Sequence, residues 1–113
     1  MTIAYLGPEA TFTHQAAIRR FGSSLRYVPL KTIADVFAEV SKRRAEYGVV
    51  PVENSTEGTV THTLDMFLTS PLKICGEIEM RIHQHLMGKM KDLSQISRIC
   101  THSQSLAQCN AWL

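Results

Sequence analysis

The chain has 113 residues and 44% hydrophobic content, which suffices for a folded core and excludes a disordered polypeptide. Its 12 Lys and Arg residues against 10 Asp and Glu residues give a net charge of +2 with no extended basic block, which argues against nucleic-acid binding. The three cysteines lack a Cys-x-x-Cys spacing, and neither a targeting signal nor an apolar run of membrane-spanning length is present, so we expect a reduced, cytoplasmic protein with no membrane partner.

Three short apolar runs at residues 3–6, 25–30 and 47–52 are rich in Val, Leu, Ile and Tyr, as is typical of strands buried on both faces of a parallel sheet. Helical patterns lie between them. The clearest has apolar residues at i, i+3, i+4 and i+7, namely Ile33, Val36, Phe37 and Val40, and Thr32 is its expected N-cap. This alternation predicts a β-α-β-α-β unit and therefore an α/β fold.

A third helix is expected after Gly58, ending before Pro71, because the residue that precedes a proline is disfavoured in the α region. From residue 72 to residue 83 the pattern changes to near-strict alternation, with apolar side chains at the even positions. We interpret it as one long strand that crosses between two lobes. The expected division is a first lobe at 1–76, followed at 77–113 by the crossing strand and the beginning of a second lobe.

Beyond the alternating segment, the sequence predicts a turn at 88–92 and a short helix at 93–96 with Asp92 as its N-cap. A further strand is expected at 98–101, followed by a helix from about Ser103. That helix carries an apolar stripe that runs to Leu113, and the chain ends there without a C-cap. We therefore expect the chain to be part of a longer protein, or to be covered by another subunit at this end.

Polar turns follow three of the predicted strands, at Gly7–His14, Val52–Gly58 and Thr101–Gln104. The carboxyl ends of parallel strands lie along one edge of a sheet, and ligands of α/β proteins bind in the crevice at that edge. The three turns are therefore candidates for a single site.

The first two turns each allow a functional and a structural interpretation. Thr11 can present its hydroxyl beside an anion-binding helix N-terminus, or it can be an ordinary N-cap. Glu53 can act as a general acid or base, or it can orient Asn54 and stabilise the loop. Ser55 and Thr56 add hydroxyl groups to the same turn.

The third turn and the helix after it supply hydroxyl, imidazole and amide groups from Thr101, His102, Gln104 and Gln108. The alternative is a helix capped by Ser103 whose glutamines are solvated. His102 has no carboxylate partner that spacing can identify, which weakens its case as a general base. His83 and His85 share one face of the alternating segment, but no third ligand lies nearby, so no metal site is expected.

Three groups of motifs, taken in order, closely resemble the prephenate dehydratase family over the whole chain. They are Ile3–Pro8 with Thr11–His14, Gly48–Ser55 with Gly58, and Thr101–Gln104 with Gln108 and Cys109. The resemblance implies a carbon–oxygen lyase that converts prephenate to phenylpyruvate with loss of water and CO2 in phenylalanine biosynthesis. It implies a two-lobed, periplasmic-binding-protein-like (type II) fold with a cleft between the lobes, no metal or organic cofactor, and a homodimer or higher oligomer for the full-length parent.

The resemblance also implies roles for individual residues. Catalytic roles fall to Asn54 and Gln108, with Glu53 supporting or tuning the site. Contacts with substrate fall to Thr11, Ser55, Thr56, Thr101, His102 and Gln104. A dianionic substrate needs donors for its carboxylates, and its leaving hydroxyl needs a proton or strong hydrogen bonds, which these groups can provide.

The sequence departs from the family pattern at several places. Ala10 stands where the family usually has Gly, and Thr101 and Ser103 stand where Ser and Pro are common. The family's Thr-Arg-Phe motif has no counterpart in these 113 residues, so the chain alone is expected to be nearly inactive. Two alternatives are a non-catalytic module of the same fold that binds small anions, and an interaction segment whose last helix, with Trp112 and Leu113, docks on a partner chain.

Overall fold

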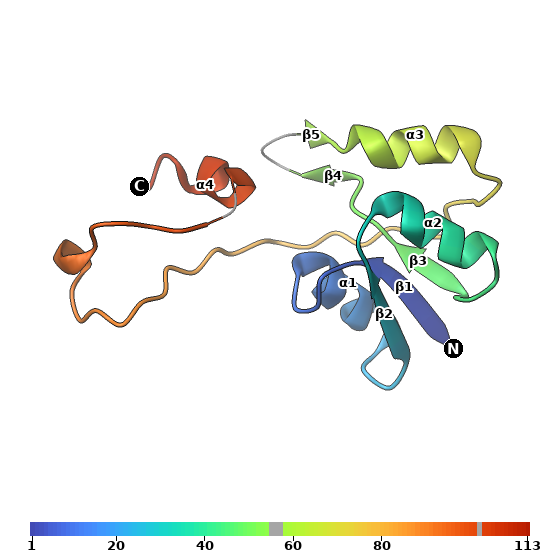
Figure 1. Ribbon diagram of the computed structural model, residues 1–113, viewed down its shortest axis with the longest axis horizontal. Coiled ribbons are helices and arrows are strands. Elements are labelled where there is room, and N and C mark those ends of the chain that lie inside the picture. The colour runs from blue at the N-terminus through green and yellow to red at the C-terminus, as the bar shows by residue number, and fades with distance from the viewer. Residues whose placement is uncertain (55–57, 102) are drawn as a thin grey trace. The chain divides into compact units, whose positions relative to one another are not determined.

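The computed structural model describes residues 1–54, 58–101 and 103–113 (Figure 1). The chain divides into two compact units, Met1–Met80 and Arg81–Leu113. The first unit contains all the strands of the described residues and three of the α-helices.

The first unit is built on a parallel sheet of three strands. These are β1 (Thr2–Leu6), β2 (Arg26–Leu30) and β3 (Tyr47–Val49), in the order β2-β1-β3. Ala4 of the central strand β1 lies opposite Val28 on one side and Gly48 on the other. The predicted parallel α/β unit is thereby confirmed. The third strand is shorter than the predicted run at 47–52, because Pro51 has no N–H to donate to a ladder.

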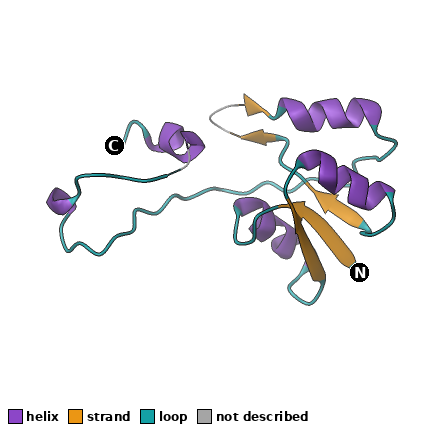
Figure 2. Cartoon of the chain, viewed as in Figure 1, coloured by secondary structure: helices purple, strands orange, loops and turns teal. Residues whose placement is uncertain are grey.

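Three α-helices accompany this sheet: α1 (Phe12–Phe21), α2 (Ile33–Ser41) and α3 (Thr61–Thr69) (Figure 2). The predicted N-cap of α2 is confirmed, since Oγ1 of Thr32 accepts a hydrogen bond of 3.0 Å from the N–H of Asp35. Helix α3 ends at Thr69, before Pro71, as predicted.

Helices α1 and α2 cover opposite faces of the sheet, because successive side chains of β1 point to opposite sides. Ala4 packs with Val36 of α2 and with Ala45, while the ring of Tyr5 stacks on His14 of α1. Residues Ile3, Ala4 and Tyr5 are all fully buried. The central strand therefore forms the core on both faces.

A short antiparallel pair precedes α3, formed by β4 (Glu53–Asn54) and β5 (Gly58–Thr59). This hairpin was not predicted, and it means that the second polar turn does not lead directly into a helix. Thr63 of α3 is fully buried, and its Oγ1 donates a hydrogen bond of 2.7 Å to the carbonyl of Pro51. That bond ties α3 to the segment between β3 and the hairpin.

The long strand predicted from residue 72 is absent, since residues 70–92 form neither helix nor strand in the structure. The predicted strand at 98–101 is absent as well. A strand needs a neighbouring backbone to complete its hydrogen bonds, and alternation in the sequence cannot show whether such a neighbour exists. Ile74 and Met87 are accordingly 67% and 86% exposed.

The second unit contains a 3₁₀-helix, η1 (Leu93–Gln95), and α4 (Ser103–Cys109), and both helices were predicted. Oδ1 of Asp92 caps η1 by accepting a hydrogen bond of 3.2 Å from the N–H of Ser94. The final helix ends at Cys109, so Leu113 of the predicted apolar stripe lies beyond it and is 50% exposed.

Candidate functional site

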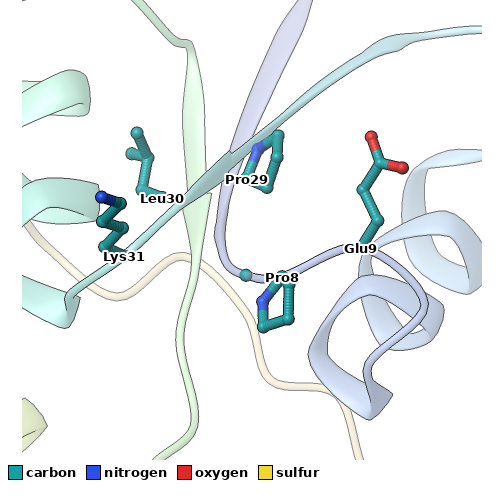
Figure 3. Close-up of a pocket in the computed structure, with 6 residues that line it drawn as sticks. Pro8, Glu9, Pro29, Leu30 and Lys31 are labelled. Carbon is teal, nitrogen blue, oxygen red and sulfur yellow. The ribbon is translucent and has the colours of Figure 1, made fainter.

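A pocket of about 550 Å³ lies at the carboxyl ends of β1 and β2, the sheet edge at which ligands of α/β proteins bind. Its lining consists of Gly7, Pro8, Glu9, Pro29, Leu30 and Lys31 (Figure 3). Figure 3 shows the side chains of Glu9 and Lys31 on opposite sides of the two prolines. The pocket thus combines apolar walls with one acidic and one basic group.

The two loops that form the pocket are joined by their backbones. The N–H of Gly7 donates a hydrogen bond of 2.8 Å to the carbonyl of Leu30. A Cβ atom at position 7 would lie 2.9 Å from Cβ of Pro29, so only glycine allows this close approach. The end of β1 and the end of β2 are therefore held together at the pocket.

Thr11 lies in the same turn and is the N-cap of α1. Its Oγ1 accepts a hydrogen bond of 3.3 Å from the N–H of His14 and donates one of 3.0 Å to the carbonyl of Pro8. The capping interpretation of Thr11 is thus confirmed. The cap takes up the N–H of His14, one of the first N–H groups of α1, which have no intrahelical acceptors because of their position; an anion can bind to the others.

The second turn is described only in part. Glu53 is exposed, and in the hairpin it lies opposite Thr59, as Asn54 lies opposite Gly58. Ser55 and Thr56 lie outside the described residues. The structure therefore describes the backbone of Glu53 and Asn54 as one strand of a short antiparallel pair.

The third turn belongs to the other unit, Arg81–Leu113. Thr101 is exposed, Gln104 lies in α4, and His102 lies outside the described residues. Oε1 of Gln108 accepts a hydrogen bond of 2.9 Å from Nε2 of Gln84. This bond fixes which end of the Gln108 amide remains available as a donor, namely its NH2 group.

Two features could not be identified from the motifs alone: the pocket residues Glu9 and Lys31, and Gln84 as the partner of Gln108. Lys31 follows the second strand and therefore reaches the same sheet edge as the first turn. Its position directly after a parallel strand could therefore have identified it from the sequence. Gln84 could not be identified in this way, because its contact joins two segments that are 24 residues apart.

Three aromatic rings, those of Tyr5, His14 and Tyr27, pack against one another. The ring of Tyr5 stacks on that of His14 with a centroid distance of 4.5 Å and an interplanar angle of 7°, and Tyr27 meets Tyr5 edge-on at 6.5 Å. Tyr27 donates its hydroxyl to the carbonyl of Gly22. Within the part of the chain that the structure describes, the buried hydroxyl of Tyr5 has no hydrogen-bond partner.

Burial has electrostatic consequences for both tyrosines. Desolvation raises the pKa of Tyr5, and the negative charge of Glu9 raises it further. Desolvation also raises the pKa of Tyr27. Both phenols therefore stay protonated and neutral in the range around neutral pH.

The described ranges show neither a cluster of metal ligands nor a helix that could cross a membrane. No three His, Cys, Asp or Glu side chains there come close enough together to hold a metal ion, and His83 and His85 are both exposed. Among the helices of residues 1–54, 58–101 and 103–113, none has the length and apolar character needed to cross a bilayer.

Comparison with known proteins identifies the family. A family model described as prephenate dehydratase matches residues 3–113. The chain is 54% identical over 111 residues to a bifunctional chorismate mutase/prephenate dehydratase from Aquifex aeolicus, covering 98% of this chain and 31% of that protein. It is 35% identical over 117 residues to a prephenate dehydratase from Bacillus subtilis, covering 100% of this chain and 41% of that protein.

A solved structure gives the same result. The chain resembles a prephenate dehydratase from Streptococcus mutans with a TM-score of 0.58 and 38% sequence identity, over 60% of this chain and 35% of that one. The chain thus spans 31% of the length of the relative from Aquifex aeolicus and 41% of that from Bacillus subtilis. Since the family model covers nearly every residue, the chain belongs to the prephenate dehydratase family.

Proposed function

We propose that the chain forms part of a prephenate dehydratase, a carbon–oxygen lyase that converts prephenate to phenylpyruvate, CO2 and water in phenylalanine biosynthesis. The observation that carries the proposal is the family match over residues 3–113. The pocket at the carboxyl ends of β1 and β2 supports it, because it lies at the ligand-binding edge of a parallel sheet.

The proposed architecture is the two-lobed, type II periplasmic-binding-protein-like fold, with residues 1–76 as the first lobe and 77–113 as the beginning of the second. The β2-β1-β3 order of the parallel sheet supports this assignment. In the full-length protein, the alternating segment after residue 72 would pair with further strands and bury its apolar side. We also propose a cytoplasmic location and a homodimer or higher oligomer for that protein.

The chemistry of the reaction suggests how the residues divide the work. Prephenate dianion takes up one proton and yields phenylpyruvate, CO2 and water: the bond to the ring carboxylate breaks, its electrons restore the aromatic ring, and the hydroxyl leaves as water. The substrate therefore needs donors at its carboxylates and a proton or strong hydrogen bonds at the leaving oxygen.

The first of these needs matches the β1–α1 turn. The N-terminus of α1 provides N–H groups, and Lys31 provides a cation at the opposite wall of the pocket. Thr11, whose hydroxyl caps the helix, is proposed to contact the substrate beside these groups. The proton or strong hydrogen bonds at the leaving oxygen are assigned to Asn54 and Gln108, supported by Glu53. Ser55, Thr56, Thr101, His102 and Gln104 are proposed to contact the substrate around them.

An assay of phenylpyruvate formation from prephenate tests the proposal. It compares the 113-residue chain with the full-length protein from the same source. We expect turnover by the full-length protein and nearly none by the chain alone, because the chain lacks the family's Thr-Arg-Phe motif. Prephenate binding without turnover by the full-length protein would instead indicate the alternative, a non-catalytic module that binds small anions.

A further inference from the structure

The turn that lines the pocket is held by a histidine with no role in the site described above. The N–H of Ala10 donates a hydrogen bond of 2.9 Å to Nδ1 of His14. The same imidazole stacks on the fully buried Tyr5 and lies 5.9 Å, between ring centroids, from Tyr27 of β2. His14 therefore joins the turn to the buried centre of the sheet.

The other hydrogen bonds of this turn have acceptors that do not titrate near neutral pH. They run from Gly7 N–H to the Leu30 carbonyl (2.8 Å), from Thr11 Oγ1 to the Pro8 carbonyl (3.0 Å), and from His14 N–H to Thr11 Oγ1 (3.3 Å). Carbonyl and hydroxyl oxygens accept in both neutral and mildly acidic solution. Among these bonds, the one from Ala10 to His14 is therefore the one that depends on a proton.

An imidazole nitrogen that accepts a hydrogen bond carries no proton, so the ring of His14 is neutral with its proton on Nε2. Protonation would place an N–H at Nδ1, facing the N–H of Ala10, and would add positive charge to the first turn of α1, where the helix dipole is already positive. The first effect removes the acceptor of the bond from Ala10, and the second destabilises the first turn of α1.

Three titratable groups lie around the ring, namely Tyr5, Tyr27 and Glu9. Tyr5 faces the imidazole from β1 and Tyr27 faces it from β2, and burial raises the pKa of both phenols. Glu9, in the turn itself, acts on the Tyr5 hydroxyl. Neither phenol changes charge between about pH 5 and 8, where imidazoles titrate.

We propose that His14 is a positioning residue: its neutral form holds the Pro8–Ala10 turn in the geometry that lines the pocket, and its protonation releases that turn. The consequence for substrate rests on the proposed function, since it takes prephenate as the ligand of this pocket. The effect of His14 on the turn itself does not rest on the proposed function.

Two variants distinguish the effect of the hydrogen-bond acceptor of His14 from the effect of its stacked ring. His14→Asn places an amide oxygen close to the position of Nδ1 and removes the ring stack. His14→Phe keeps a planar ring against Tyr5 and removes the acceptor. His62→Asn, at an exposed position of α3, is the matched control.

Nitrogen-15 NMR of the 113-residue chain tests the bond directly, by the tautomer of His14 and the hydrogen exchange of the Ala10 amide at about pH 7.5 and about pH 5. We expect the Nε2–H tautomer at the higher pH, and exchange slowed about fivefold relative to the lower pH after correction for the intrinsic rate. The Asn variant should protect Ala10 at both pH values and the Phe variant at neither. An Nδ1–H tautomer, or equal protection in wild type and Phe variant, would overturn the proposal.

Steady-state kinetics of the full-length protein tests the consequence for substrate. The Phe variant should raise KM for prephenate about fivefold at neutral pH with kcat unchanged, while the Asn variant restores KM and removes its rise at acidic pH. Equal KM values in wild type and Phe variant would overturn the effect on the pocket. Full protection of Ala10 in a protein that neither binds nor converts prephenate would refute the proposed function and leave the His14 bond established.

Discussion

Ala10 adopts a φ of 64°, in the left-handed region that costs a residue with a Cβ about 1 kcal/mol or more. The resemblance to the family led us to expect glycine at this position, and the backbone conformation gives a physical reason for that expectation. The alanine is tolerated here because the surrounding hydrogen bonds, including the one to His14, hold the turn in place.

The substitution Ala10→Gly should therefore stabilise the first unit by about 0.5 kcal/mol, the relief of strain being offset in part by the greater freedom of glycine in the unfolded chain. Urea unfolding followed by circular dichroism measures this difference. The control is Ala38→Gly in the interior of α2, which should destabilise by about 1 kcal/mol. A loss of stability at position 10 as large as that at position 38 would contradict the strain argument.

Tyr5 combines complete burial with a hydroxyl that lacks a partner among the described residues. Removing that hydroxyl by Tyr5→Phe should raise the free energy of unfolding by about 1 kcal/mol at neutral pH. Because the pKa of Tyr5 is raised above 10.0 in the folded state, the folded protein holds the phenol proton more tightly than the unfolded chain does, and the free energy of unfolding falls as pH rises from about 10.0 through the raised pKa. The variant should consequently lose part of the alkaline sensitivity of the wild type; the same alkaline unfolding profile in both proteins would count against this account.

Helix α2 and strand β3 pack at the distance that Gly48 permits. A Cβ atom at this position would lie 2.9 Å from Cγ1 of Val36 and 3.1 Å from Cγ2 of Val40. Val36 is almost completely buried, so it cannot move aside without disturbing the core around Ala4. The close packing of α2 on β3 therefore depends both on the absence of a side chain at position 48 and on the fixed position of Val36.

We expect Gly48→Ala to destabilise the first unit by about 1–3 kcal/mol through overpacking. The control is Gly76→Ala, whose added methyl group would meet, among the described residues, Nη2 of Arg20 alone at 4.0 Å and should change stability by less than about 0.5 kcal/mol. Denaturant midpoints of the two variants measured side by side decide the point, and equal midpoints would show that α2 can shift away from β3.

A second prediction concerns the start of α2. Thr32→Ala should cost about 1 kcal/mol, because the N–H of Asp35 loses its acceptor, whereas Thr32→Ser should retain nearly full stability. Thermal unfolding of both variants provides the measurement. A serine variant as unstable as the alanine variant would mean that the threonine methyl group, rather than the cap, matters at this position.

The elements also show what sequence could predict. Periodicity and capping were sufficient for β1, β2 and the helices, because these signals are local and the structure completes their hydrogen bonds within or next to each element. The segment from residue 72 carries an equally clear alternation, yet it forms no strand in this structure, since pairing depends on a neighbour that alternation does not specify. The candidate residues divide in the same way: the capping role of Thr11 follows from local sequence, whereas the place of Lys31 at the pocket and the contact of Gln84 with Gln108 depend on tertiary structure.

The two ends of the parallel sheet differ in what they contain. The pocket lies at the carboxyl ends of the strands, while at the amino ends Oε2 of Glu46 accepts a hydrogen bond of 2.7 Å from the N–H of Thr2. This bond, with a smaller contribution from the backbone N–H of Glu46 itself, lowers the pKa of the Glu46 carboxyl. The charged carboxylate thus fastens the start of β1 to the segment before β3.

Acid should therefore lower the free energy of unfolding by weakening the Thr2–Glu46 bond, which lies at the end of the sheet remote from the pocket. Since the folded-state pKa of Glu46 is below 4.5, its contribution to stability is fully present above pH 4.5 and is lost as pH falls through the lowered value. Glu46→Gln should reduce the pH dependence of the unfolding free energy in this range, and Glu79→Gln, at an exposed site, should leave it unchanged. Unfolding curves collected across the acidic range test this; identical slopes for wild type and the Glu46 variant would refute it.

The order of elements along the chain has one more consequence, which concerns protein synthesis. All three strands of the parallel sheet lie within the first 49 residues, and both covering helices lie between them. A ribosome will thus have produced every partner of the β1 core strand before it reaches the hairpin, α3 or the second unit. The pocket at the ends of β1 and β2 can consequently take shape on the nascent chain, as a foundation against which later segments fold.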